Sequence, residues 1–203
     1  MTDAAIAERS ENSRPFIVGI GGTIKPGSST EQALQISLQA ARDVGAEIKM
    51  FGAEELVQLP HYGVPESQTN IVAKRLVEAL RKADGIIIAS PGYHGSISGL
   101  VKNAIDYIED MVNDPRVYLA GVPVGLIATA YGWQATGSTL AALRSVVHAL
   151  RGWPTPLGAG LNCSGGVFQN GACTVDGFTT QLQEVGKQVA TAGARNLAFR
   201  TAA

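Results

Sequence analysis

The sequence predicts a doubly wound α/β fold, in which helices cover both faces of a five-stranded parallel sheet of strand order 2-1-3-4-5. Apolar runs at 16–20, 84–89 and 123–129 are typical of strands buried on both faces. Segment 47–50 alternates polar and apolar residues, and 156–161 is interrupted by glycine, so both are expected at sheet edges. Edge positions for the second and fifth strands favour this order over 3-2-1-4-5-6, in which the second strand is interior.

Helices are expected after each strand, because apolar residues recur at helical spacing within 34–44, 72–83, 101–111, 140–150 and 178–189. Ser29 and Gln32 have the spacing of a capping box and locate the start of the first helix near Ser29. Residues 169–171 read Gln-Asn-Gly and predict a turn. Residues 1–14 predict a flexible N-terminal arm, and residues 15–203 a single domain.

The net charge of −1 argues against a basic nucleic-acid-binding surface. It also argues against the strongly acidic docking face of a small electron carrier. Cys163 and Cys173 lack the spacing of a zinc site and are expected to be reduced thiols. The first residues contain no apolar signal region, and no apolar stretch reaches the ~20 residues that a membrane helix needs. We therefore expect a cytoplasmic protein that contacts neither membrane nor nucleic acid.

The turn after the first strand combines glycines, hydroxyl groups and a cation at the start of a helix. Thr23, Ser28, Ser29 and Thr30 supply hydroxyls, and Lys25 supplies the charge. Free N–H groups and the helix dipole favour an anion there, and a phosphate monoester would use all of these groups. The turn matches neither the Walker A motif nor Gly-x-Gly-x-x-Gly. The alternative interpretation is a capped helix after a glycine-rich turn.

The loop after the third strand borders the same crevice, since the loops after strands one and three flank the topological switch point. Gly92 and Gly95 leave peptide groups that can lie flat against a planar ring, and Tyr93 and His94 can stack on it or border it. For His94, ring-edge contact or plain packing is favoured over a general-base role. Trp133 either covers a ligand or packs at the surface. No acid/base dyad, nucleophile elbow or triad is recognised, so no catalytic side chain is assigned.

Together the two loops resemble a known family. Residues 22–30 are similar to the first loop of the NAD(P)H-dependent FMN reductases of the flavodoxin-like superfamily, which typically reads Gly-Ser-x-Arg-x-x-Ser-x-Asn. Residues 91–106 are similar to the more specific second motif, Pro-Glu-Tyr-Asn-Gly-Ser-Ile-Pro-Gly followed by Leu-Lys-Asn-Ala-Ile-Asp. The likeness extends over roughly residues 15–190. Gly92, His94 and Ser98 replace the usual glutamate, asparagine and proline.

The resemblance implies roles for individual residues in binding FMN. The FMN phosphate would be held by Thr23, Lys25, Ser28 and Thr30. The isoalloxazine ring would be framed by Pro91, Tyr93, His94, Gly95 and Ser96, with Thr129 and the Gly132 region on its other side. Lys25 stands where the family has arginine, so a point charge replaces a bidentate clamp.

The function expected from this resemblance is hydride transfer from NADH or NADPH to FMN, with reduced flavin passed on to a partner monooxygenase. One alternative sends the electrons to quinone, azo or metal acceptors. A second alternative is a non-enzymatic flavodoxin-type carrier, against which the near-neutral charge speaks. The family implies a homodimer or a pair of dimers that meet through the helix after the second motif. The sequence leaves open the preferred nicotinamide, and whether FMN is a prosthetic group or a substrate.

Overall fold

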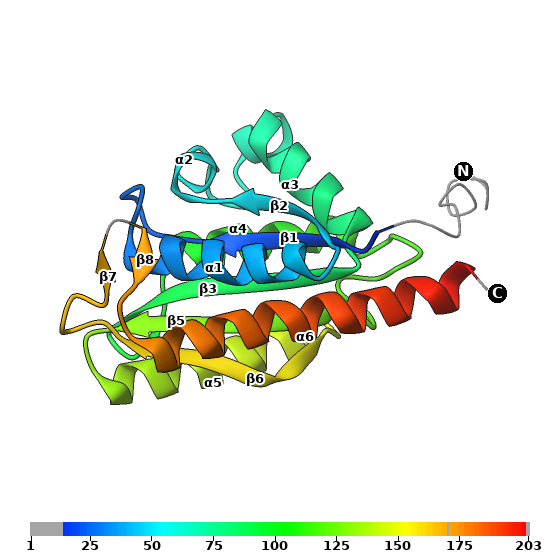
Figure 1. Cartoon of the computed structure of the whole chain (residues 1–203). Coiled ribbons are helices and arrows are strands. Elements are labelled where there is room, and N and C mark those ends of the chain that lie inside the picture. Colours follow the sequence, from blue (N-terminus) through cyan, green and yellow to red (C-terminus); the bar gives the residue numbers. More distant parts are fainter. Residues whose placement is uncertain (1–13, 170, 202–203) are drawn as a thin grey trace.

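A computed structural model describes residues 14–169 and 171–201 of the chain, so most of the predicted arm lies outside the described residues. Five parallel strands form the centre of the molecule (Figure 1). They are β1 (Phe16–Gly21), β2 (Glu47–Phe51), β3 (Gly85–Tyr93), β5 (Pro123–Ala130) and β6 (Trp153–Asn162). Their order across the sheet is β2-β1-β3-β5-β6. The α/β class and the parallel sheet are therefore as predicted.

The sheet has one strand more than the five predicted. Strand β4 (Ser96–Ile97) turns back from the end of β3 and pairs with Gly92 and Tyr93 in antiparallel register. With β4 set aside, β5 and β6 stand at the two positions that the prediction gave to the fourth and fifth strands. A further short hairpin, β7 (Phe168–Gln169) and β8 (Ala172–Cys173), flanks the predicted turn at 169–171, of which residue 170 lies outside the described residues.

Helices cover both faces of the sheet. They are α1 (Ser29–Asp43), α2 (Ala53–Leu56), α3 (Ile71–Lys82), α4 (Gly99–Asp106), α5 (Trp133–Ala149) and α6 (Asp176–Thr201), with 3-10 turns η2 (Pro65–Gln68) and η3 (Tyr107–Met111). Figure 1 shows α1 and α6 along one face, and the buried residues of α3, α4 and α5 join the cluster on the other. In the described part of the chain, every helix is too short or too polar to cross a bilayer.

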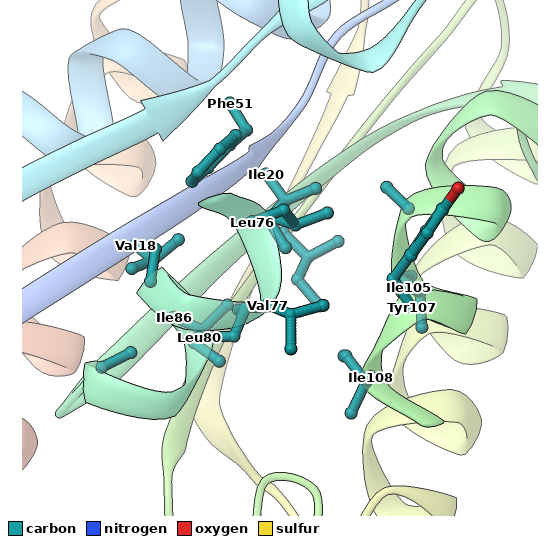
Figure 2. Close-up of a cluster of buried hydrophobic side chains, with 14 of the residues drawn as sticks. Val18, Ile20, Phe51, Leu76, Val77, Leu80, Ile86, Ile105, Tyr107 and Ile108 are labelled. Carbon is teal, nitrogen blue, oxygen red and sulfur yellow. The ribbon is translucent and has the colours of Figure 1, made fainter. Parts of the chain in front are cut away.

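Alternate residues of the central strands supply the two apolar cores. On β3, Ile86 and Ile88 face the α3–α4–α5 side, and Ile87 faces α1 and α6. Figure 2 shows Ile86 packed among side chains such as Leu80 of α3. Each fully buried side chain of this size contributes about 1.5–3 kcal/mol to folding. This two-sided burial explains why the sequence of the central strands reads as an unbroken apolar run.

Helices α1 and α6 approach each other closely at one glycine. A Cβ atom on Gly186 would lie 2.0 Å from the carbonyl oxygen of Ser37. Beside this contact, the Ser37 hydroxyl donates a hydrogen bond to the Leu182 carbonyl at 2.7 Å. The α6 backbone therefore lies directly on α1, the helix whose first turn borders the site.

The topology places a crevice at the carboxyl ends of the central strands. The chain leaves β1 for β2 on one side and reaches β3 on the other, with Gly21 of β1 beside Ala89 of β3. The loops that follow β1 and β3 therefore run in opposite directions from this point and leave a crevice between them. Ligands of open α/β sheets bind at such switch points.

Candidate active site

A cavity of about 620 Å³ opens at this end of the sheet. Its wall is formed by segments 23–30, 91–93 and 129–131 together with residues between 163 and 168. Cavities of about 300–1,000 Å³ are the usual size of small-molecule sites. Nine predicted site residues line it, namely Thr23, Lys25, Ser28, Ser29, Thr30, Pro91, Gly92, Tyr93 and Thr129. Two loops distant in sequence thus meet in one cavity, as the site prediction requires.

The first turn of α1 forms the polar end of the cavity. Ser28, and not Ser29, is the N-cap residue, since its hydroxyl accepts a hydrogen bond from the Glu31 N–H at 3.3 Å. Accepting this bond leaves the Ser28 hydroxyl proton free to be donated. The Thr23 hydroxyl folds back on the loop, accepting from the Lys25 N–H at 3.1 Å. Lys25 is the one charged residue among those that the structure describes in the cavity wall.

Glu31 organises this loop from beneath and was missed in the sequence. One carboxylate oxygen accepts from the Gly27 N–H at 2.6 Å, and the other accepts from the Ala53 N–H at 3.1 Å. Glu31 is 8% exposed. The signal that would have found it is Ser-x-x-Glu, with Ser28 as the cap and Glu31 three residues later.

A pair of buried hydroxyls joins the two halves of the site. The Thr30 and Thr129 side-chain oxygens lie 2.6 Å apart, although the residues are 99 positions apart in sequence. Both residues are nearly inaccessible and both line the cavity. In such a pair one hydroxyl donates to the other, so one proton remains for another acceptor. A ligand oxygen in the cavity is the acceptor that this pair can serve.

The other end of the cavity is formed by the end of β3. Pro91 is buried and Tyr93 is 52% exposed at the cavity wall. A Cβ atom on Gly92 would lie 2.7 Å from the Thr139 hydroxyl of α5, which explains why glycine occupies the position of the family's glutamate. Ser98, in place of the family's proline, caps α4 by accepting from the Val101 N–H at 3.2 Å.

Four predicted residues lie outside the cavity wall. His94, Gly95 and Ser96 form the exposed tip of the β3–β4 hairpin, and Gly132 is the N-cap residue of α5. His94 has φ 52° and Gly95 has φ 84°, the positive values that a tight two-residue hairpin turn requires. Histidine and asparagine both tolerate this conformation better than most residues, so the turn explains the exchange at position 94.

Sequence reasoning missed two aromatic residues and did not place a thiol at the cavity. Tyr131, 83% exposed, and Phe168 of β7 both line it. Cys163 lines it as well, and burial raises the pKa of its thiol to about 11. The thiol is therefore protonated at neutral pH. Trp133 lies edge-to-face against Phe178, with ring centroids 6.1 Å apart, and is 62% exposed.

These features fit FMN. The start of α1, with its hydroxyls and Lys25, suits a phosphate group, and the Thr30–Thr129 pair supplies a donor beside it. The end of β3 offers proline, glycine and tyrosine to a planar ring. No group of three or more metal-binding side chains was found among the described residues.

Comparison with known proteins identifies the family. A family model described as NADPH-dependent FMN reductase matches residues 15–162. The chain belongs to this family. The resemblance found in the two loops is thereby confirmed, and with it an NAD(P)H-dependent flavin oxidoreductase that uses FMN.

Individual relatives agree with this placement. An FMN-dependent NADPH-azoreductase of Staphylococcus haemolyticus is 32% identical over 143 residues, which are 68% of this chain and 71% of the relative. The protein of the same name from Staphylococcus aureus is 35% identical over 116 residues, 56% of this chain and 58% of the relative. Among solved structures, an NADH:FMN oxidoreductase in its apo form has a TM-score of 0.69 at 22% identity, covering 87% of this chain and 89% of the other. At that identity the likeness shows the fold.

Proposed function

We propose that this chain transfers reducing equivalents from NADPH or NADH to FMN bound in the cavity between α1 and the ends of β3 and β5. The observation that carries the proposal is the meeting of two loops in one cavity, with an anion-binding helix start at one end and a flat, partly apolar wall at the other. Bound FMN would supply the two-electron chemistry. The protein's part is to bind and orient it.

Each segment has a distinct role in this binding. Lys25 and the hydroxyls of Ser28 and Ser29 neutralise and hold the phosphate. The Thr30–Thr129 pair donates its remaining proton to a ligand oxygen deeper in the cavity. Pro91, Gly92 and Tyr93 set the plane of the ring. His94, Gly95, Ser96 and Gly132 support the loops that border the ring, from the hairpin tip and the start of α5.

No side chain of the site is assigned a proton-transfer role. Hydride transfer to a flavin needs orientation and a suitable electrostatic environment rather than a general base. His94 lies at the exposed hairpin tip, outside the cavity wall, and the Cys163 thiol is protonated. We therefore expect the rate of hydride transfer to depend on how the nicotinamide ring is placed against the isoalloxazine ring.

The electron acceptor is either free flavin, which a partner monooxygenase would consume, or a quinone or azo compound. The second candidate is favoured by the azoreductase relatives and by the exposed rings of Tyr93 and Tyr131 at the cavity wall. Aromatic rings at the rim of a site stack readily on planar acceptors.

We place residues 15–203 in a single domain, which assembles as a homodimer or homotetramer through α4. Support comes from a groove of about 310 Å³ between α4 and α5, whose wall includes Ile105 and Val146. A cytoplasmic location is supported by the use of NAD(P)H and by the free thiols of Cys163 and Cys173. Light scattering on the purified protein tests the assembly.

The function is tested by anaerobic mixing of the protein with NADPH or NADH and FMN. Loss of nicotinamide absorbance together with bleaching of the flavin supports the proposal. Absence of flavin binding and of nicotinamide oxidation refutes it. Turnover is then compared with FMN, a benzoquinone and an azo dye at equal NADPH, and the acceptor with the highest kcat/KM decides between the two candidates.

A further inference from the structure

Glu31 places a negative charge directly under the loop that is to hold the phosphate. Glu31 is 8% exposed, and its carboxylate accepts hydrogen bonds from two backbone N–H groups, those of Gly27 and Ala53, at 2.6 and 3.1 Å. A Cβ atom on Gly52 would lie 2.3 Å from one carboxylate oxygen, so the space around the group is filled. The carboxylate is thereby held beneath the loop.

This arrangement reduces what the loop can offer to an anion. The Gly27 N–H, which a glycine-rich loop would otherwise offer to a phosphate, donates to Glu31. The Thr23 hydroxyl is taken up within the loop by the backbone of Lys25. The single lysine in the described cavity wall is then opposed by a buried carboxylate on the adjoining turn of α1. At neutral pH a phosphate monoester carries a charge of about −1.5 to −2, and a buried charge of the same sign disfavours it.

We propose that Glu31 sets the affinity for FMN by opposing its phosphate, so that FMN is exchanged as a substrate rather than retained as a prosthetic group. This inference rests on the proposed function, since it concerns the same site. Glu31 bonds to the loop and is not among the residues that line the cavity, and it is therefore a positioning residue. Its charge acts on the phosphate alone, so riboflavin, which lacks the phosphate, is the ligand that isolates the effect.

The test is a fluorescence titration of the full chain with FMN and with riboflavin. In Glu31→Gln, the ratio of the riboflavin Kd to the FMN Kd is expected to rise about tenfold, as removal of one nearby like charge predicts. Glu55→Gln is the matched control, because Glu55 is half-buried in the same junction and accepts the Gly52 N–H at 3.2 Å. In that variant the ratio is expected to change less than about twofold, since the charge lost is bonded to α2 rather than to the loop.

A ratio that is unchanged or lower in Glu31→Gln overturns the inference, because the carboxylate would then serve only to shape the loop. Failure of the wild-type chain to bind either flavin overturns the proposed function, and the inference with it. The rate at which bound FMN exchanges with free FMN on the wild-type chain gives a second measurement that needs no variant. FMN loaded on the protein should exchange with isotopically labelled free FMN within the time of a desalting column, whereas flavin retained for hours contradicts the inference.

Discussion

The hydroxyl pair of Thr30 and Thr129 offers a quantitative test of how the two halves of the site are joined. Valine in place of Thr129 keeps the shape of the side chain but leaves the hydroxyl of Thr30, a residue that is 2% exposed, without its partner at 2.6 Å. A buried polar group that loses its partner costs about 1–3 kcal/mol. Replacement of both hydroxyls by apolar groups of the same shape is close to neutral. Thr129→Val alone is therefore expected to destabilise the chain more than Thr30→Val/Thr129→Val does.

The assay is urea unfolding of the flavin-free chain and of the two single variants and the double variant, with thermal unfolding as a check. For a chain of this size, 2 kcal/mol corresponds to a shift in Tm of about 4–8 °C. The FMN Kd, measured separately, should rise most in the double variant, because each single variant keeps one hydroxyl proton for the ligand and the double variant keeps none. If the costs of the two single variants simply add in the double variant, the two hydroxyls do not interact and the account of this pair is wrong.

Three further predictions concern the hairpin tip, the helix contact and the cavity thiol. His94→Asn should raise the free energy of unfolding by up to about 1 kcal/mol, because asparagine suits the positive φ of this turn better; a loss of stability would contradict the turn assignment. Gly186→Ala should lower the free energy of unfolding by about 3 kcal/mol, since its Cβ would meet the Ser37 carbonyl. Gly137→Ala in α5 has open space around it and should raise the free energy of unfolding by about 0.5–1 kcal/mol. Equal effects of the two variants in urea unfolding would refute this packing. A maleimide at pH 7 should label the more exposed Cys173 before Cys163, because the pKa of the Cys163 thiol is raised to about 11. Bound FMN should protect Cys163 from the maleimide, since this thiol lines the cavity. Mass spectrometry that finds Cys163 modified first, or not protected by FMN, would contradict its place in the cavity.

The sheet was predictable because its central strands are buried on both faces. The apolar runs through Ile17, Ile87 and Ile127 have no other stable location in a chain of this polarity. Strand β4 was missed because two residues carry no periodic signal, and its pairing depends on the turn at His94 and Gly95. That turn had a readable signal, since a residue tolerant of positive φ precedes a glycine.

The site was predictable at the level of its loops and less so at the level of individual atoms. The start of α1 near Ser29 was predictable, but its N-cap residue was not, because Ser28, Ser29 and Thr30 are all acceptable N-cap residues and only the backbone selects Ser28. Tyr131 and Phe168 could not be placed because a line of sequence does not tell which loops bend over a cavity. The Thr30–Thr129 bond depends on the register of α1 against β5, which only the packed structure supplies.

Amide hydrogen exchange with and without FMN tests most directly whether the loops after β1 and β3 bind the same ligand. The account predicts that FMN slows exchange in peptides covering residues 22–30, 90–99 and 128–135, and leaves the far ends of the strands unchanged. Protection of only one of these loops, or protection elsewhere on the molecule, would contradict it.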